Sequence, residues 1–548
     1  MGFTLRRSLP SITGLLALVL IIGVAAVIWA GAPVWFPAVF AIGIIGLQYA
    51  INPLIIQWLV PATVIDHDGQ RYLTDHPVGE LVARRCRDAG VPLVKLGIVD
   101  DGNPNAFTFG RTPSDARMWI TRGLLERLDE RELDAVVSHE VGHVKHWDFA
   151  VMTLAAVVPM VLYLVFLVTR TSGRQGKLIA IGAYVAYWIS YFTLLALSRA
   201  REYAADHWSV ECTHDGDALA SALVKIAYGM GQVQAERKEE ARALAESKGR
   251  GRSRSSGFDR AAIRGRSMNV MGIFDQREAD ALAAAFASGI DPTRAVAAMR
   301  WEVVNPWGRT LEKLSSHPLV ARRIEALEKV SPGAPEHWSV LRATATVPAS
   351  EAAAVRHSFW GQFAIAVAPW IILAVAVLGG VLHSVFSVGL AVAVAGCLFL
   401  LKQRIRYPTT FEAVDEVTSL LERIDASPVA GIGVNVKGRI IGRGMPGYVL
   451  SPDLVVQDES GFVPLLYRQP LPLWGSLFAL FRADKYFGQE VMAQGWYRRL
   501  PGPAVELRAV TAADGVHTRT WSWVTRYVAS GLVLLAGLIV MAVGLAGA

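Results

Sequence analysis

Two histidines four residues apart are the first feature of this sequence that could do chemistry. They frame the pentapeptide His139-Glu140-Val141-Gly142-His143. Residues four apart share one face of a helix, so both imidazoles can reach a single metal ion. Glu140 lies one position round the helix, beside a water that the ion would hold. The spacing therefore predicts that His139 and His143 bind Zn²⁺ with Glu140 as general base. The alternative is that two surface histidines fall at this spacing by chance.

A catalytic zinc ion needs a third protein ligand. The predicted helix runs through Asp148 straight into an uncharged run, Phe149–Thr169, and a second uncharged run, Leu178–Ser198, follows. An antiparallel helical hairpin would bring Glu202, just beyond the second run, back to the level of Glu140. We therefore expect Glu202 to be the third zinc ligand.

Polar residues near these ligands could orient them. Asp206 could accept a hydrogen bond from a ligand imidazole and fix its tautomer. Arg199, one turn before Glu202, could orient that carboxylate. Asp148 could cap or orient the helix that carries the histidines, or merely mark the membrane boundary. The alternative for residues 199–206 is an exposed, charged face beside the membrane.

The helix that positions the histidines has its own sequence signals. Asp129 and Glu132 have the spacing of a capping box, and Leu133, Val136 and Val137 supply an apolar face. Three widely spaced cysteines form no CxxC motif, so nitrogen and oxygen atoms must hold any metal.

The composition indicates a membrane protein. Of 548 residues, 53% are hydrophobic and 18% charged, whereas soluble chains carry roughly 25% charged residues. The uncharged runs predict seven spans, since about 20 apolar residues cross a bilayer. They are 11–30, 34–59, Phe149–Thr169, Leu178–Ser198, two within His357–Leu401 and Tyr527–Ala548. The first run could instead be a signal peptide.

The Lys/Arg bias predicts a cytoplasmic N-terminus. Six basic residues then fall on the cytoplasmic side: Arg6, Arg7, Lys402, Arg404, Arg406 and Arg526. The basic loop Arg170–Lys177 opposes this topology. In this orientation, the polar regions 60–148, 199–356 and 403–526 face the cytoplasm, and the protein lies in the cell membrane.

The net charge of +7 comes mostly from one segment. Residues 237–266 hold ten Lys/Arg and four acidic residues and are rich in Gly and Ser, which predicts a flexible loop. We expect this loop to contact anionic headgroups or to gate the active site.

The fold class expected is a multi-pass α-helical membrane protein with a zincin-like, mainly α metallopeptidase domain and a small C-terminal β domain, OB-like at best. The predicted divisions are 1–60 (two spans), 61–356 (peptidase domain with the hairpin 149–198), 357–402 (two spans), 403–526 (β domain) and 527–548 (final span).

Within the β domain, Gly442–Gly447 matches GxGxxG, but strand signals follow it, which excludes a dinucleotide site. Residues 407–525 hold eleven basic and twelve acidic residues, so no nucleic-acid partner is expected. The apolar segment Leu471–Phe481 is either a core helix or a helix on the membrane surface.

The motif HExxH-x4-D, followed by two spans and S-R-x-x-E-x-x-x-D, resembles the HtpX-like membrane zinc metallopeptidases, relatives of the type-1 CAAX prenyl proteases. Three further segments resemble that family: Asn103–Gly110 (N-A-F-x-x-G), Gly123–Leu125 (G-L-L) and Ser316–Pro318 with Arg322–Ile324 ((S/T)-H-P…R-I). The resemblance covers about residues 10–330 and leaves the C-terminal addition unexplained.

The resemblance implies further roles. His317 would stabilise the oxyanion, unless it is only a histidine at a helix start before a proline. The segment with Asn105, Ala106 and Phe107 alternates like an edge strand and could pair with an extended substrate, or be an ordinary hairpin strand.

The function expected is a membrane zinc endopeptidase that binds one Zn²⁺ per chain and contacts membrane lipids. It would cleave membrane-associated or misfolded polypeptides at the cytoplasmic face. The alternative is a catalytically inactive membrane scaffold that works through its C-terminal domain.

Overall fold

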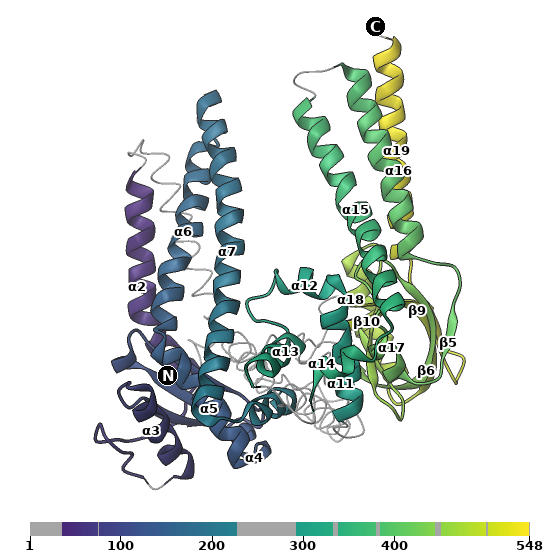
Figure 1. Ribbon diagram of the computed structural model, residues 1–548. Helices are drawn as coiled ribbons and strands as arrows, with labels where there is room; N and C mark the ends of the chain where they lie inside the picture. Colours follow the sequence, from purple (N-terminus) through teal and green to yellow (C-terminus); the bar gives the residue numbers. More distant parts are fainter. Residues whose placement is uncertain are drawn as a thin grey trace. The chain divides into compact units, whose positions relative to one another are not determined.

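The structure is a computed structural model (Figure 1). It describes residues 35–74, 76–171, 173–226, 292–331, 338–379, 384–443, 451–499 and 502–546. The predicted first span, 11–30, and the basic loop 237–266 lie outside the described residues, so both stay predictions.

The chain divides into two compact units. The first comprises Met1–Val233, Gly251–Gln276 and Glu312–Trp338, and the second comprises Gln234–Arg250, Arg277–Leu311 and Ser339–Ala548. The first unit carries the histidine motif. Arg277–Leu311, which the sequence division assigned to the peptidase domain, groups with the C-terminal unit.

A four-stranded sheet forms the strand layer of the first unit. Its strands are β1 (Thr63–Ile65), β2 (Lys95–Val99), β3 (Ala106–Phe109) and β4 (Arg117–Thr121), in the order β1-β2-β4-β3. Within the part of the chain that the structure describes, β3 pairs with β4 alone, antiparallel, so it lies at an edge of this sheet. Phe107 and Phe109 pack with Trp119 in a buried cluster, which fixes the face that β3 turns to the core.

The helices of the first unit are α2 (Trp35–Leu59), α3 (Pro77–Ala89), α4 (Arg122–Arg127), α5 (Glu130–Lys145), α6 (Asp148–Thr169), α7 (Gly173–Thr213) and α13 (Val320–Val330). The predicted capping box at the start of α5 is confirmed. Asp129 Oδ1 accepts from the Glu132 amide at 2.9 Å, and Glu132 Oε2 accepts from the Asp129 amide at 3.0 Å. These bonds satisfy backbone donors that the first turn leaves open.

The helix with the histidines does not run straight into the membrane, so that prediction was wrong. The helix α5 ends at Lys145, and α6 begins at Asp148. Between them Trp147 has φ 58°, a left-handed conformation that no continuous helix contains. The break ends α5 before the apolar run and places Asp148 at the first turn of α6.

Five helices are long and apolar enough to cross a membrane, counted over the described residues. They are Asp148–Thr169, Gln175–Thr213, Ala349–Ala376, Val385–Arg406 and Ser522–Ala546. Each covers one of the predicted spans. The predicted second span, 34–59, coincides with the 25-residue helix α2 (Trp35–Leu59), which is not among these five.

The remaining helices belong largely to the C-terminal part. They are α11 (Pro292–Val304), α12 (Pro306–Glu312), α14 (Val340–Ala345), α15 (Ala349–Gly379), α16 (Val385–Arg406), α17 (Val417–Glu422), α18 (Pro472–Phe481) and α19 (Ser522–Ala546). In Figure 1, α16 and α19 lie side by side. Glycines allow this approach, since a Cβ at Gly537 would lie 2.3 Å from the Ala393 nitrogen.

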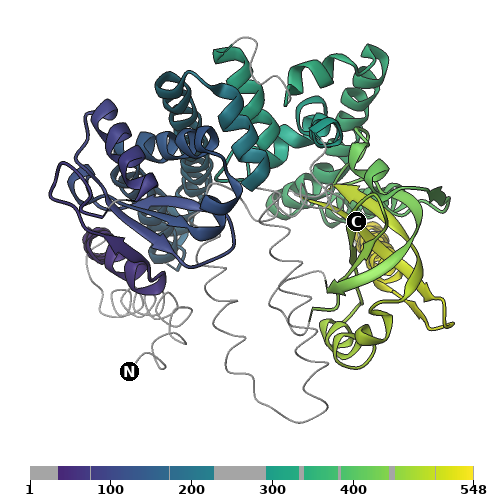
Figure 2. The ribbon, with the colours of Figure 1, turned by 90° about the horizontal axis from the view of Figure 1, so that it is seen from below.

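The strands of the C-terminal unit are β5 (Glu412–Val414), β6 (Ile432–Arg443), β7 (Leu454–Gln457), β8 (Phe462–Leu466), β9 (Glu490–Arg499), β10 (Pro503–Ala512) and β11 (His517–Arg519). Five of them close a ring, because β9 joins β10 to β6 and completes the path β6-β7-β8-β10 (Figure 2). The result is a small barrel filled by apolar side chains such as Val434, Val436, Leu465 and Val505, all fully buried.

Candidate metal centre

Three side chains from two helices converge inside the first unit. His139 and His143 project from α5, and their Nε2 atoms lie 3.2 Å apart. Glu202 comes from α7, with Oε2 3.7 Å from His139 Nε2 and Oε1 3.8 Å from His143 Nε2. One ligand atom from each residue lies within 4.8 Å of the other two. The structure thus brings together the three residues predicted as zinc ligands.

A glycine allows the two helices to come this close. A Cβ at Gly142 would lie 3.2 Å from Ala205 Cα and 3.0 Å from Trp208 Cδ1 on α7. Ser209 Oγ, also on α7, donates to the Ala135 carbonyl at 2.7 Å. This close approach positions Glu202 opposite the two histidines.

Both imidazoles bond to carboxylates through Nδ1, which leaves Nε2 free to face a metal. Asp206 Oδ1 lies 3.0 Å from His139 Nδ1, as predicted for its tautomer. Asp148 Oδ2 lies 2.5 Å from His143 Nδ1, so Asp148 contacts this imidazole as well as beginning α6. Carboxylate–histidine pairs of this kind fix ring orientation and raise ligand basicity at metal sites.

The residues present fit a zinc ion. Two imidazole nitrogens and one carboxylate are a donor set of catalytic zinc. Glu202 Oε2 is buried and has no hydrogen-bond partner among the described residues, as expected of an oxygen reserved for a metal. Burial disfavours the imidazolium form of His143, yet the hydrogen bond to Asp148 and the Glu202 charge outweigh burial and raise the pKa of His143. Surroundings this negative also favour a bound cation.

Two arginines neutralise the supporting carboxylates, and sequence reasoning gave neither a role. Arg323 of α13, fully buried, donates to Asp206 through Nη2 at 2.6 Å and Nε at 2.8 Å. Arg201 Nε lies 2.8 Å from Asp148 Oδ1. The sequence offered one indication of a role for Arg323: this arginine lies on the apolar, buried face of an amphipathic helix.

Glu140 is 3% exposed and is held by a residue that the sequence did not single out. Thr108 Oγ1, on the edge strand β3, donates to Glu140 Oε2 at 2.7 Å. The alternation of β3 gives the only sequence signal for it. Phe107 and Phe109 face the core, so Thr108 must face the other way.

Comparison with known proteins places the fold and site in a family. A model of peptidase family M48 matches residues 73–331. The protease HtpX homolog of Methanothermobacter thermautotrophicus is 39% identical over 221 residues, which are 40% of this chain and 83% of that protein. This chain belongs to peptidase family M48.

A second curated relative agrees with this assignment. The protease HtpX homolog 2 of Methanosarcina acetivorans is 33% identical, over 40% of this chain and 76% of that protein. The crystal structure of S. mikatae Ste24p aligns with 58% of this chain and 63% of its own, at 15% identity and a TM-score of 0.34. The M48 match ends at residue 331, so the barrel and last three apolar helices lie outside it.

His317 lies beside the candidate metal centre. Its Nδ1 is 3.3 Å from Glu202 Oε1, and the side chain is 18% exposed. Arg199, predicted to orient Glu202, instead donates through Nη1 to the carbonyls of Glu312 (3.0 Å) and Ser315 (2.7 Å). It therefore holds the loop before His317, because a guanidinium on a long stem reaches past its own helix face.

The strand predicted to bind substrate could contact it through its backbone but not through the three predicted side chains, which are buried. Asn105, Ala106 and Phe107 are at most 2% exposed. Asn105 is tied down through its carbonyl, which accepts from the amide and the hydroxyl of Thr121, each at 3.0 Å. Any pairing with an extended peptide would use the open backbone edge of β3.

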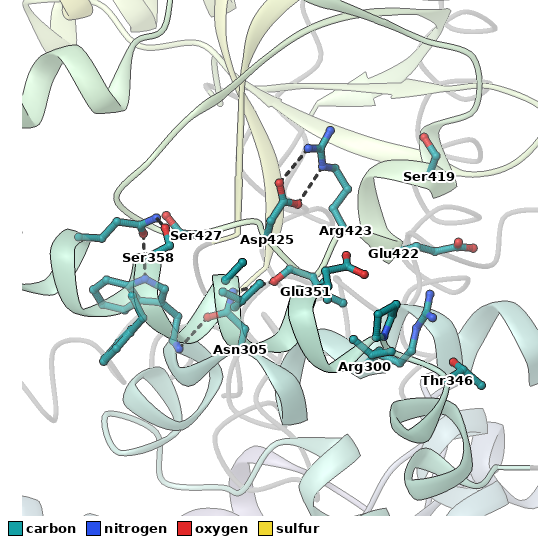
Figure 3. A pocket seen from close by; sticks show the side chains of 18 residues that line it. Arg300, Asn305, Thr346, Glu351, Ser358, Ser419, Glu422, Arg423, Asp425 and Ser427 are labelled. Atoms are coloured by element: carbon teal, nitrogen blue, oxygen red, sulfur yellow. Dashed lines mark hydrogen bonds and ion pairs between the residues drawn. The ribbon is translucent and has the colours of Figure 1, made fainter.

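A cavity of about 660 Å³ in the C-terminal unit offers no comparable chemistry (Figure 3). Its lining contains no histidine or cysteine. Arg423 is paired with Asp425 through two hydrogen bonds of 3.0 and 2.8 Å, drawn as dashed lines. The candidate residues for metal binding and catalysis therefore all come from the first unit.

Proposed function

We propose that this M48-family chain is a membrane zinc endopeptidase that cleaves membrane-associated or misfolded polypeptides at the cytoplasmic face of the cell membrane. One observation carries the proposal. The His139, His143 and Glu202 ligand atoms converge beside Glu140, in a chain whose family relatives are named as proteases.

The metal that suits this set is zinc, held by His139, His143 and Glu202. When bound, zinc lowers the pKa of a water toward ~7 and polarises the scissile carbonyl. The chain's own residues do the rest. Asp206 and Asp148 keep the two imidazoles turned so that Nε2 points inward.

Glu140 is the proposed general base. Its carboxylate accepts a proton as water attacks the peptide carbonyl and then donates that proton to the leaving amine. The Thr108 hydroxyl, 2.7 Å from Oε2, holds the carboxylate in one orientation. Such fixed placement removes an ordering cost from the reaction.

His317 is the proposed donor to the oxyanion. Its Nδ1 lies 3.3 Å from Glu202 Oε1, so the imidazole borders the candidate metal site. A donor aimed at the place where negative charge develops stabilises the tetrahedral intermediate. The edge strand β3 is proposed to receive the substrate backbone, beside Glu140.

The barrel is proposed to be OB-like, and it lies outside the M48 match. Its ring order and the placing of α18 (Pro472–Phe481) between the third and fourth barrel strands support this assignment. We assign it no catalytic step.

The deciding experiment is Glu140→Gln in the full-length protein reconstituted in lipid. Cleavage of an unfolded polypeptide should fall by at least ~100-fold, the usual contribution of a general base. Glu130→Gln, an exposed glutamate at the start of the same helix, is the control and should cleave normally. Wild-type cleavage by Glu140→Gln would overturn the mechanism and favour a membrane scaffold.

A further inference from the structure

A second cavity, of about 320 Å³, opens on the outer face of the barrel. Its lining comes from β6, β9, β10, β11 and the start of α19: Asn435, Met492, Gln494, Arg508, Ala509, Thr511, His517, Arg519, Thr520, Trp521 and Trp523. Two arginines and a histidine line it, and no carboxylate does.

Strand register explains why these side chains share one face. Gln494 on β9 is paired with Asn435 on β6 and with Ala509 on β10. Ala509 is paired in turn with Arg519 on β11. Residues directly opposite on neighbouring strands project to the same side, so this row forms the floor of the cavity.

The basic groups have unused hydrogen-bonding capacity. Among the described residues, neither Arg508 nor Arg519 forms an ion pair with a carboxylate, and no carboxylate lines the cavity. The Arg508 guanidinium lies over Phe411 (5.1 Å) and Trp523 (5.8 Å), which orients it without neutralising it. Arg519 Nε donates to His517 Nε2 at 3.0 Å, which leaves its other donors open.

The cavity lies where the last apolar helix begins. Thr520 and Trp521 immediately precede α19 (Ser522–Ala546), a membrane-span candidate whose first turn carries the positive end of the helix dipole. Trp521 is 51% exposed, and tryptophan is enriched at the membrane–water interface. The cavity therefore faces the level of the lipid headgroups.

The helix α18 lies at the same level and presents apolar side chains outward. Gln469, three residues before α18, donates to the Arg519 carbonyl and accepts from the Trp521 amide. The exposed apolar side chains of α18 are Leu473, Trp474, Leu477, Leu480 and Phe481, with Phe481 71% exposed. This face is typical of a helix that lies in a membrane surface. Gly475, Phe478 and Ala479 are buried and Phe478 packs in the barrel core, so α18 also has a core-facing side.

We propose that this cavity binds the phosphate of an anionic phospholipid headgroup. Two guanidinium groups suit a phosphate because their forked donors match its oxygens. The positive end of α19 adds to the attraction. An apolar rim of Trp521 and α18 would sit among the acyl chains while the headgroup enters the cavity. A free phosphate ion shares the charge but not the acyl chains.

The test uses the purified full-length protein in a non-ionic detergent. Bound lipid is counted by native mass spectrometry after titration with phosphatidylglycerol or phosphatidylcholine, and inorganic phosphate is titrated separately. The wild type should prefer phosphatidylglycerol, and Arg508→Gln with Arg519→Gln should lose about tenfold or more of that affinity. Arg519→Gln alone, an exposed substitution, should lose a measurable part if the double variant does not fold.

Arg439→Gln, which changes an exposed arginine of β6 outside the cavity, is the matched control for Arg519→Gln and should bind phosphatidylglycerol like the wild type. Equal retention of phosphatidylglycerol by the cavity variants, or no preference over phosphatidylcholine in the wild type, would overturn the proposal. If inorganic phosphate competes fully at equal concentration, the site binds a free anion and the lipid assignment is wrong.

Discussion

At the residue scale, the candidate metal centre consists of charged and polar side chains arranged in successive layers. Two imidazoles and one carboxylate face inward, each imidazole is backed by a carboxylate, and each of those carboxylates meets an arginine. This layering lets acidic groups stay buried without a metal and leaves Glu202 Oε2 open for one.

Thr108→Val tests whether the edge strand positions the general base. The substitution removes the hydroxyl that donates to Glu140 but keeps the β-branched shape. We expect kcat to fall by roughly tenfold with KM little changed, the size of one hydrogen bond to a charged group. Thr108→Ser should restore most of the activity. Steady-state kinetics on one peptide substrate would measure this, and an unchanged kcat would rule out the positioning role.

The sequence predicted that three candidate ligands would come together, because the two histidines are close in sequence and a helical hairpin returns the chain to the same level. His139, His143 and Glu202 needed only helix periodicity and two uncharged runs. Thr108 and Arg323 could not be found this way, because their roles depend on tertiary packing between β3, α5 and α13. Arg199 was assigned to the wrong partner for the same reason.

At the element scale, a buried arginine of α13 links this helix to α7 and, through α7, to α5. Arg323 is fully buried and bonds to Asp206, which in turn bonds to His139. The capping box of α5 was predictable from four residues, whereas the break at Trp147 was not, because nothing in its sequence excludes a continuous helix.

Arg323→Met should destabilise the first unit by about 3–5 kcal/mol, because it leaves Asp206 buried without a partner charge. Chemical denaturation of the full-length protein in detergent would measure the change. Lys329→Met, at an exposed position of the same helix, is the control and should change stability by less than about 0.5 kcal/mol. Equal stability of both variants would show that the buried Arg323–Asp206 pair does not stabilise the first unit.

The close pair α16–α19 makes a separate prediction. Gly537→Val would drive a side chain into the Ala393 backbone and should lower the thermal unfolding midpoint in detergent, at a cost of about 1–3 kcal/mol or more. Gly531→Val, on the same helix with nothing within 4 Å of its Cβ, should leave the midpoint unchanged. Equal midpoints would mean that the two helices are not in backbone contact.

At the scale of the whole molecule, an M48 peptidase region is joined to a C-terminal part that adds a small barrel and three apolar helices. Composition predicted the membrane character well, since charge gaps mark apolar helices directly. The closure of the barrel was harder to predict from the sequence, because the pairing of β9 with both β10 and β6 depends on contacts distant in sequence.

The Lys/Arg bias predicts which side of the membrane each polar region occupies. With the N-terminus cytoplasmic, a cysteine at Lys95 should resist a membrane-impermeant maleimide in intact cells and react after lysis. A cysteine at Thr171, in the turn between α6 and α7, should react in intact cells. The native cysteines are removed first, although burial raises the pKa of the Cys86 thiol to about 11 and makes it a poor nucleophile. The reverse labelling pattern would place the metal centre outside the cytoplasm.

The most direct test of the central claim is the zinc content of the purified full-length protein, measured together with its cleavage activity. We predict about one zinc per chain in the wild type and in Glu140→Gln, and a strongly reduced content in Glu202→Gln, with cleavage only in the wild type. A Glu202→Gln protein that keeps its zinc and its activity would contradict the account.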